Sequence, residues 1–202
     1  MAISIELIKQ LRTATGVGVQ DCRKALEQAN ADYGKALGML REQGLEKAAQ
    51  RAEKPANQGI IELYSHGNGR VGVMVEVRTE TDFAARSTDL RRFAHEIALQ
   101  IAAAAPRYVR DEDIPTEVIE HEALRAAGRA REEGKADAII PRIVNGYLKK
   151  YKDKTVLLRQ PYIRDDKLTV EQLLGQASAS VGENIIIRRF TRWELGDGGE
   201  SE

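Results

Sequence analysis

The spacing of apolar residues in the first part of the chain is typical of short amphipathic helices. A first helix is predicted to follow Ser4 as its N-cap and to carry an apolar stripe of Ile5, Ile8 and Leu11. Two glycines in the segment Thr15-Gly16-Val17-Gly18 should end it. A second helix is indicated by Val19, Cys22, Leu26 and Ala29. A third, capped by Asp32 and expected to end near Gly44, carries Tyr33, Ala36, Leu37 and Leu40.

After these three helices, the spacing of apolar residues changes from that of a helix to that of a strand. Residues 45–57 are rich in Ala, Lys, Glu and Gln and end near Pro55, where a helix should stop, so we interpret them as a helical linker. An apolar run from Ile60 to Tyr64 then precedes the turn sequence His66-Gly67-Asn68-Gly69. From Val71 to Val77, valine occupies every second position, as a strand with one buried face requires. Together these segments predict a β-hairpin.

Helical periodicity returns beyond the hairpin. One helix should be capped within Ser87-Thr88-Asp89 and end before Pro106, with an apolar face of Leu90, Phe93, Ile97 and Ile101. Two more helices are expected beyond Pro115, one running to about Glu133 and one starting near Lys135. The pattern breaks at Gln160-Pro161-Tyr162, and Thr169 is suited to cap another helix. A last strand is predicted from Ile185 to about Leu195.

These elements predict an α+β fold, with an N-terminal three-helix bundle, a linker helix, and a core in which a small antiparallel sheet packs with helices. The predicted division places the bundle in residues 1–50, the linker in 51–57 and the core in 58–196. Residues 197–202 are rich in glycine and acidic residues and have nothing to bury, so we expect a disordered tail.

Composition narrows the classes of function. Lys and Arg together number 31, as do Asp and Glu, so the basic excess typical of a dedicated nucleic-acid binder is absent. A single cysteine, Cys22, cannot form an intramolecular disulfide. No apolar run approaches the roughly 18 residues needed to span a bilayer. We therefore expect a reduced, cytoplasmic protein that contacts neither a membrane nor nucleic acid directly.

The sequence offers little for catalysis. It contains neither a Gly-x-x-x-x-Gly-Lys-Ser/Thr loop nor a Gly-x-Gly-x-x-Gly motif after a strand. The histidines His66, His95 and His121 lack metal-ligand spacing and are interpreted as surface residues. The run Lys149-Lys150-Tyr151-Lys152-Asp153-Lys154 could touch RNA, but Asp153 interrupts it and a solvated helix face is favoured. These observations indicate a binding protein rather than an enzyme, with no cofactor and no metal.

The segment after the valine strand leaves two interpretations open. Phe83 shares the parity of the buried valines, so it could extend the buried face of the strand. A strand that reaches Phe83 would however exceed the usual length of about 3–10 residues. The intervening Glu80-Thr81-Asp82 is also poor strand sequence. The alternative is an exposed Phe83 with a functional role.

Three segments closely resemble signatures of the elongation factor Ts family. The first spans residues 11–26 and contains Arg12, Thr15-Gly16, Gly18 and Asp21-Cys22-Arg23-Lys24-Ala25-Leu26. The second spans residues 70–83 and ends in Glu80-Thr81-Asp82-Phe83. The third spans residues 182–194 and begins with Gly182-Glu183-Asn184-Ile185. The likeness runs in order through most of the chain, from residue 3 to residue 196.

The resemblance implies a guanine nucleotide exchange factor that promotes release of GDP from elongation factor Tu in protein synthesis. It implies that the bundle resembles a ubiquitin-associated domain and docks on the GTPase domain of Tu, while an Asp-Phe wedge disturbs the magnesium and phosphate site. Carried over to this sequence, the implied contact residues are Arg12, Val19, Gln20, Thr81, Asp82 and Phe83. For Phe83, the resemblance therefore favours exposure.

A homodimer is also expected. One sheet of few strands leaves an apolar face and open edges, and two copies related by a twofold axis could cover them. Some short members of the family have a cysteine where this chain has Thr191, so here the dimer would rest on packing alone. The alternative to an exchange factor is a ubiquitin-associated-like adaptor that binds a helical protein without catalysing exchange.

Overall fold

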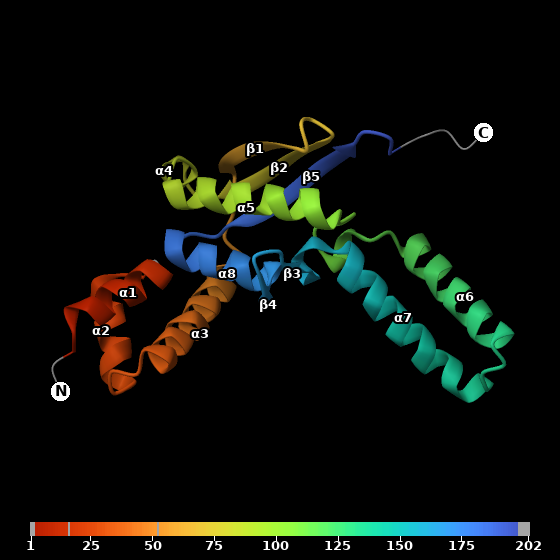
Figure 1. Ribbon diagram of the computed structural model, residues 1–202, viewed down its shortest axis with the longest axis horizontal. Helices are drawn as coiled ribbons and strands as arrows, with labels where there is room; N and C mark the ends of the chain where they lie inside the picture. Colours follow the sequence, from red (N-terminus) through yellow and green to blue (C-terminus); the bar gives the residue numbers. More distant parts are fainter. Residues whose placement is uncertain (1–2, 16, 52, 198–202) are drawn as a thin grey trace. The chain divides into compact units, whose positions relative to one another are not determined.

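The computed structural model describes residues 3–15, 17–51 and 53–197, which have the predicted α+β fold (Figure 1). The chain divides into two compact units, one formed by Met1–Leu99 and Glu171–Glu202 and the other by Gln100–Val170. Of the expected disordered tail, residues 198–202 lie outside the described residues. Among the helices in the described ranges, none has the length and apolar character needed to cross a bilayer.

Three helices form the N-terminal bundle: α1 (Ile5–Thr15), α2 (Val19–Gln28) and α3 (Tyr33–Arg51). Two predicted caps are present. The Ser4 hydroxyl accepts a hydrogen bond from the Glu6 amide (3.2 Å), and the Asp32 carboxylate accepts one from the Lys35 amide (3.0 Å). The helices enclose a buried cluster of Leu11, Cys22, Ala25, Leu26, Ala29, Ala36 and Leu40.

The prediction that Gly44 ends the third helix is wrong, because α3 continues through this glycine to Arg51. Gly44 is buried, and a Cβ atom at this position would lie 3.0 Å from the Cβ of Ala179. The glycine therefore allows the close approach of a second segment rather than a turn. Sequence alone does not separate these two uses of a helical glycine.

A three-stranded antiparallel sheet follows, with the order β1 (Gln58–His66), β2 (Val71–Thr79) and β5 (Ile186–Glu194). The predicted hairpin and the predicted last strand are thus confirmed. The register places Ile60 opposite Val77 and Val75 opposite Phe190. The four valines of β2 are buried, as their alternation predicted.

Helix α5 (Thr88–Ala104) packs beside β1, where the His95 Nδ1 atom lies 2.9 Å from the Glu62 carboxylate and the rings of Tyr64 and His95 meet edge to face. The Ser87 hydroxyl caps α5 by accepting a hydrogen bond from the Leu90 amide (3.1 Å). Helix α8 (Val170–Val181) begins directly after Thr169, as predicted. The residues of α5 that face the core in the first unit are Leu90, Phe93, Ala94, Ile97 and Ala98.

The second unit contains the paired helices α6 (Thr116–Glu132) and α7 (Ile140–Thr155) (Figure 1). The prediction that the second of these starts near Lys135 is wrong. A 3-10 turn at Asp137–Ile139 comes first, and α7 begins beside Pro141, whose missing amide suits a first helical turn. Where the sequence indicated only a break, a small sheet pairs β3 (Pro161–Tyr162) with β4 (Asp165–Thr169).

Candidate functional site

A short helix directly after the sheet strand β2 carries the residues that the resemblance singled out. Helix α4 (Asp82–Ala85) begins after Thr81, whose hydroxyl accepts a hydrogen bond from the Ala84 amide (3.2 Å). Ala84 and Ala85 are buried, and α4 packs on β1 and β2. Because helical residues turn by about 100° each, the buried alanines leave the first two residues of α4 facing outward.

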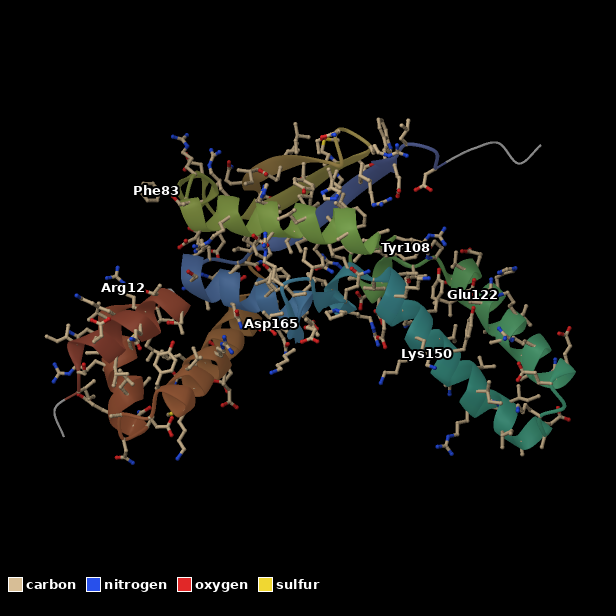
Figure 2. The ribbon with its side chains drawn as sticks, viewed as in Figure 1. Arg12, Phe83, Tyr108, Glu122, Lys150 and Asp165 are labelled. Carbon is tan, nitrogen blue, oxygen red and sulfur yellow. The ribbon has the colours of Figure 1, made fainter. Side chains whose placement is uncertain are left out.

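Phe83 and Asp82 are the two outward-facing residues. Phe83 is 87% exposed, and Figure 2 shows its side chain standing away from the ribbon. The interpretation of Phe83 as an extension of the buried strand face is therefore wrong. The Asp82 carboxylate pairs with the exposed Arg86 guanidinium at 3.2 Å. Exposed ion pairs of this kind contribute little free energy, so Asp82 can exchange Arg86 for another donor at low cost.

Glu183, which lies between α8 and β5, holds the base of this helix. Its carboxylate accepts hydrogen bonds from the Thr79 hydroxyl (2.9 Å), the Thr81 amide (3.0 Å) and the Thr81 hydroxyl (2.7 Å). Burial raises the pKa of Glu183, but the hydrogen bonds from Thr81 and Thr79 outweigh it and leave the pKa below its ordinary value. The group is thus a carboxylate at neutral pH.

Glu80 ties the same segment to the predicted linker. Its carboxylate accepts a hydrogen bond from the Asn184 amide (2.7 Å) and lies 3.8 Å from Arg51 and 3.6 Å from Lys54. The Asn184 side chain in turn donates to the Lys54 carbonyl (2.8 Å). Sequence reasoning did not assign Glu80 or Glu183 to the site. The one signal for them was their position inside two segments that resemble the family signatures.

The remaining predicted residues form a second group on the bundle. Arg12 is exposed on α1, with its side chain in solvent (Figure 2). Val19 and Gln20 open α2, and Val19 is 47% exposed. Their neighbour Cys22 is buried, which raises the pKa of its thiol. The structure therefore collects Thr81, Asp82 and Phe83 at one place and Val19 and Gln20 at another.

The histidines take no part in either group. His66, His95 and His121 are all exposed, as predicted. The His66 ring contacts the Tyr64 hydroxyl (2.9 Å), and His95 contacts Glu62. Within the described ranges, no cluster of three or more His, Cys, Asp or Glu side chains is placed to hold a metal ion.

The fold and site together define an α+β protein in which a three-helix bundle precedes a small sheet, and in which a short helix at the end of β2 exposes an acid and an aromatic residue. The family model for elongation factor TS matches residues 9–197. The chain therefore belongs to the elongation factor Ts family, a family of translation elongation factors.

Curated relatives agree over nearly the whole chain. An elongation factor Ts of Caldanaerobacter subterraneus is 50% identical over 196 residues, which cover 97% of this chain and 98% of the relative. An elongation factor Ts of Coprothermobacter proteolyticus is 49% identical and covers 98% of this chain and 100% of the relative. The elongation factor Ts of Moorella thermoacetica is 46% identical, and the match covers 95% of this chain and 94% of the relative.

Proposed function

We propose that this chain is a guanine nucleotide exchange factor that speeds the release of GDP from elongation factor Tu. Membership of the family supports the proposal. The observation that carries it is the 87% exposure of Phe83 on a helix whose next two residues are buried. An aromatic ring in water adds nothing to the core of its own chain, so it is available for burial in a partner.

The free energy expected from burial of Phe83 in the partner is sufficient for exchange. Burial of a phenylalanine side chain gains about 1.5–3 kcal/mol, and aromatic residues at interface centres often contribute about 2 kcal/mol or more. Since 1.4 kcal/mol corresponds to about tenfold in an equilibrium constant, one such contact made only in the nucleotide-free complex weakens GDP binding roughly 30-fold.

Asp82 provides the second half of the mechanism. A carboxylate beside the inserted ring competes with the phosphate groups of GDP for hydrogen-bond donors of the GTPase when that domain rearranges. Its present partner Arg86 is exposed and easily replaced. Asp82 and Phe83 thus act as a wedge at the magnesium and phosphate site, and Thr81 fixes their helix.

Exchange by this route needs no covalent step. The exchange factor binds the nucleotide-free state better than the GDP-bound state, and GDP weakens its binding by the same factor because the coupling is reciprocal. The chain therefore acts without nucleophile, cofactor or metal of its own, through contacts with protein rather than nucleic acid. The place of action is the cytoplasm, where translation occurs.

The bundle supplies the docking contact. Arg12, Val19 and Gln20 lie on exposed parts of α1 and α2 and would contact the GTPase domain of Tu. In this proposal, residues 1–50 are a ubiquitin-associated-like docking bundle, 51–57 a linker, and 58–196 the core that carries the wedge and forms the dimer.

A homodimer is part of the proposal, because the outer face of the sheet carries a patch of exposed apolar side chains beside the ion pair of Glu76 and Arg189. Cross-strand partners share a face of a sheet, and the register pairs Leu63 with Met74 and Gly72 with Trp193. Leu63 is 70% and Trp193 78% exposed, and Ile61 lies two residues from Leu63 on the same face. Stacking this face on its copy would bury these side chains around a twofold axis.

The test is release of fluorescent GDP from elongation factor Tu with and without this chain. The proposal predicts a release rate that rises with the concentration of the chain and saturates. An adaptor that binds Tu without exchange activity would form the complex and leave the release rate at its intrinsic value. That result would reject the exchange function in favour of the alternative.

A further inference from the structure

Two glutamates form a reciprocal pair of hydrogen bonds at the base of α4. Glu80 accepts a hydrogen bond from the Asn184 amide (2.7 Å), and Glu183 accepts one from the Thr81 amide (3.0 Å). Each side chain therefore binds the backbone of the segment that carries the other. This arrangement joins the end of β2 to the start of β5, which lie about a hundred residues apart in sequence.

Glu183 also accepts hydrogen bonds from two hydroxyls, those of Thr79 and Thr81, and the second of these reaches the cap of α4. The Thr81 hydroxyl donates its proton to Glu183 (2.7 Å) and accepts a hydrogen bond from the Ala84 amide (3.2 Å). A hydroxyl has one proton, so donation to Glu183 directs its lone pairs toward the helix. The carboxylate thus sets the direction of the cap that starts α4.

The short length of α4 makes this anchor important. A helix of one turn does not form by itself in water, and α4 has four residues. Its direction depends on the Thr81 cap at one end and on the burial of Ala84 and Ala85 at the other. The two residues with outward-facing side chains, Asp82 and Phe83, come directly after the capping residue Thr81 in the sequence.

We infer that Glu183 is a positioning residue for nucleotide exchange, which holds the Thr81 cap so that Asp82 and Phe83 meet the partner already ordered. The inference rests on the proposed exchange function. Without this anchor the chain must order α4 as it binds, which weakens the contact at the step where GDP leaves. Docking through the bundle does not involve Glu183.

Glu183→Gln is the direct test, because glutamine keeps the length of the side chain but replaces one acceptor by a donor that faces other donors. The GDP-release rate at saturating concentration should fall about tenfold, since a hydrogen bond to a charged group is lost. The concentration that gives half the maximal effect should stay within about twofold. The matched control is Glu171→Gln, an exposed carboxylate on α8, which should match the wild type.

Thr81 variants separate positioning from general loss of structure. Thr81→Val removes the hydroxyl at similar shape and should lower the maximal rate, whereas Thr81→Ser keeps the hydroxyl and should restore it. The loss in the double variant should be smaller than the sum of the losses in Thr81→Val and Glu183→Gln, because both break the contact between the Thr81 hydroxyl and Glu183. If Glu183→Gln does not fold, the comparison of Thr81→Val with Thr81→Ser still tests the inference.

Three results would overturn the inference. They are an unchanged maximal rate in Glu183→Gln, additive losses in the double variant, or a rise in the half-maximal concentration that alone explains the loss. Failure of the proposed function is distinguished by the wild type, which would then not accelerate GDP release at all.

Discussion

Among single residues, the position of Phe83 follows from its neighbours rather than from its own hydrophobicity. Strand β2 ends at Thr79, and Thr81 starts a helix, so the period changes from two to 3.6 just before Phe83. Ala84 and Ala85 then take the buried side of the helix. Parity with the valines of β2 therefore has no meaning at Phe83, because the strand no longer continues there.

Glu76 on the outer face of the sheet predicts how stability depends on pH. Hydrogen bonds from Arg189 and Arg78 lower the pKa of Glu76, although burial opposes them. A carboxylate with a lowered pKa stabilises the fold above its unfolded pKa of about 4.3, and this contribution is lost as pH falls through the folded pKa. The free energy of unfolding should therefore decrease as the pH falls below about 5.

The variant Glu76→Gln isolates this contribution in urea denaturation at several pH values. It should be less stable than the wild type at pH 7, and the two proteins should converge at low pH because the wild-type carboxylate is then protonated. Glu120→Gln, at an exposed position on α6, is the control and should follow the wild-type curve. A difference between Glu76→Gln and wild type that is constant with pH would contradict this account.

Among the helices and strands, β1 can begin beside β2 because of Gly59. Its φ angle is +150°, and a Cβ atom would lie 2.1 Å from the Val77 carbonyl oxygen. Gly59→Ala should therefore destabilise the protein by about 2 kcal/mol or more. A Cβ atom added at Gly72 on β2 would meet none of the described atoms within 4 Å, so Gly72→Ala should be neutral or stabilise by up to about 1 kcal/mol. Equal urea midpoints for the two variants would contradict this assignment.

The elements that sequence predicted well are those whose periodicity is regular over many residues. The valines of β2 and the apolar stripe of α5 are examples, because burial repeats at a constant interval in each. Short or interrupted elements escaped prediction. The strands β3 and β4 have two and five residues, too few for a period to be read. Gly44 had the residue type of a helix end but a packing role in the fold.

The candidate site was predicted in part for the same reason. Thr81, Asp82 and Phe83 were found through resemblance, since four residues of α4 carry no helical period. Glu183 was missed as a partner of Thr81 because 102 residues separate them and a single sequence contains no record of that contact. A contact between residues so far apart in sequence can be assigned only once the strand order is known, because that order places β5 beside β2.

For the molecule as a whole, the exposed apolar patch on the outer face of the sheet predicts a dimer held by packing. Light scattering over a dilution series should give twice the monomer mass at high micromolar concentration and dissociation at low concentration. Leu63→Glu places a charge in the apolar face and should yield a monomer. Leu124→Glu is the matched control, because Leu124 is 73% exposed on α6, outside the sheet. A wild type that is monomeric at all these concentrations would refute the dimer.

If exposed Phe83 drives GDP release, its loss must slow exchange without unfolding the protein, so the decisive comparison is wild type against Phe83→Ala on fluorescent GDP bound to elongation factor Tu. Because the ring is 87% exposed, Phe83→Ala should keep the melting temperature of the wild type. It should lose about 30-fold in release rate, the equivalent of about 2 kcal/mol. Leu195→Ala, at another exposed apolar residue, should retain the wild-type rate. Release by Phe83→Ala at the wild-type rate would contradict a driving role for Phe83.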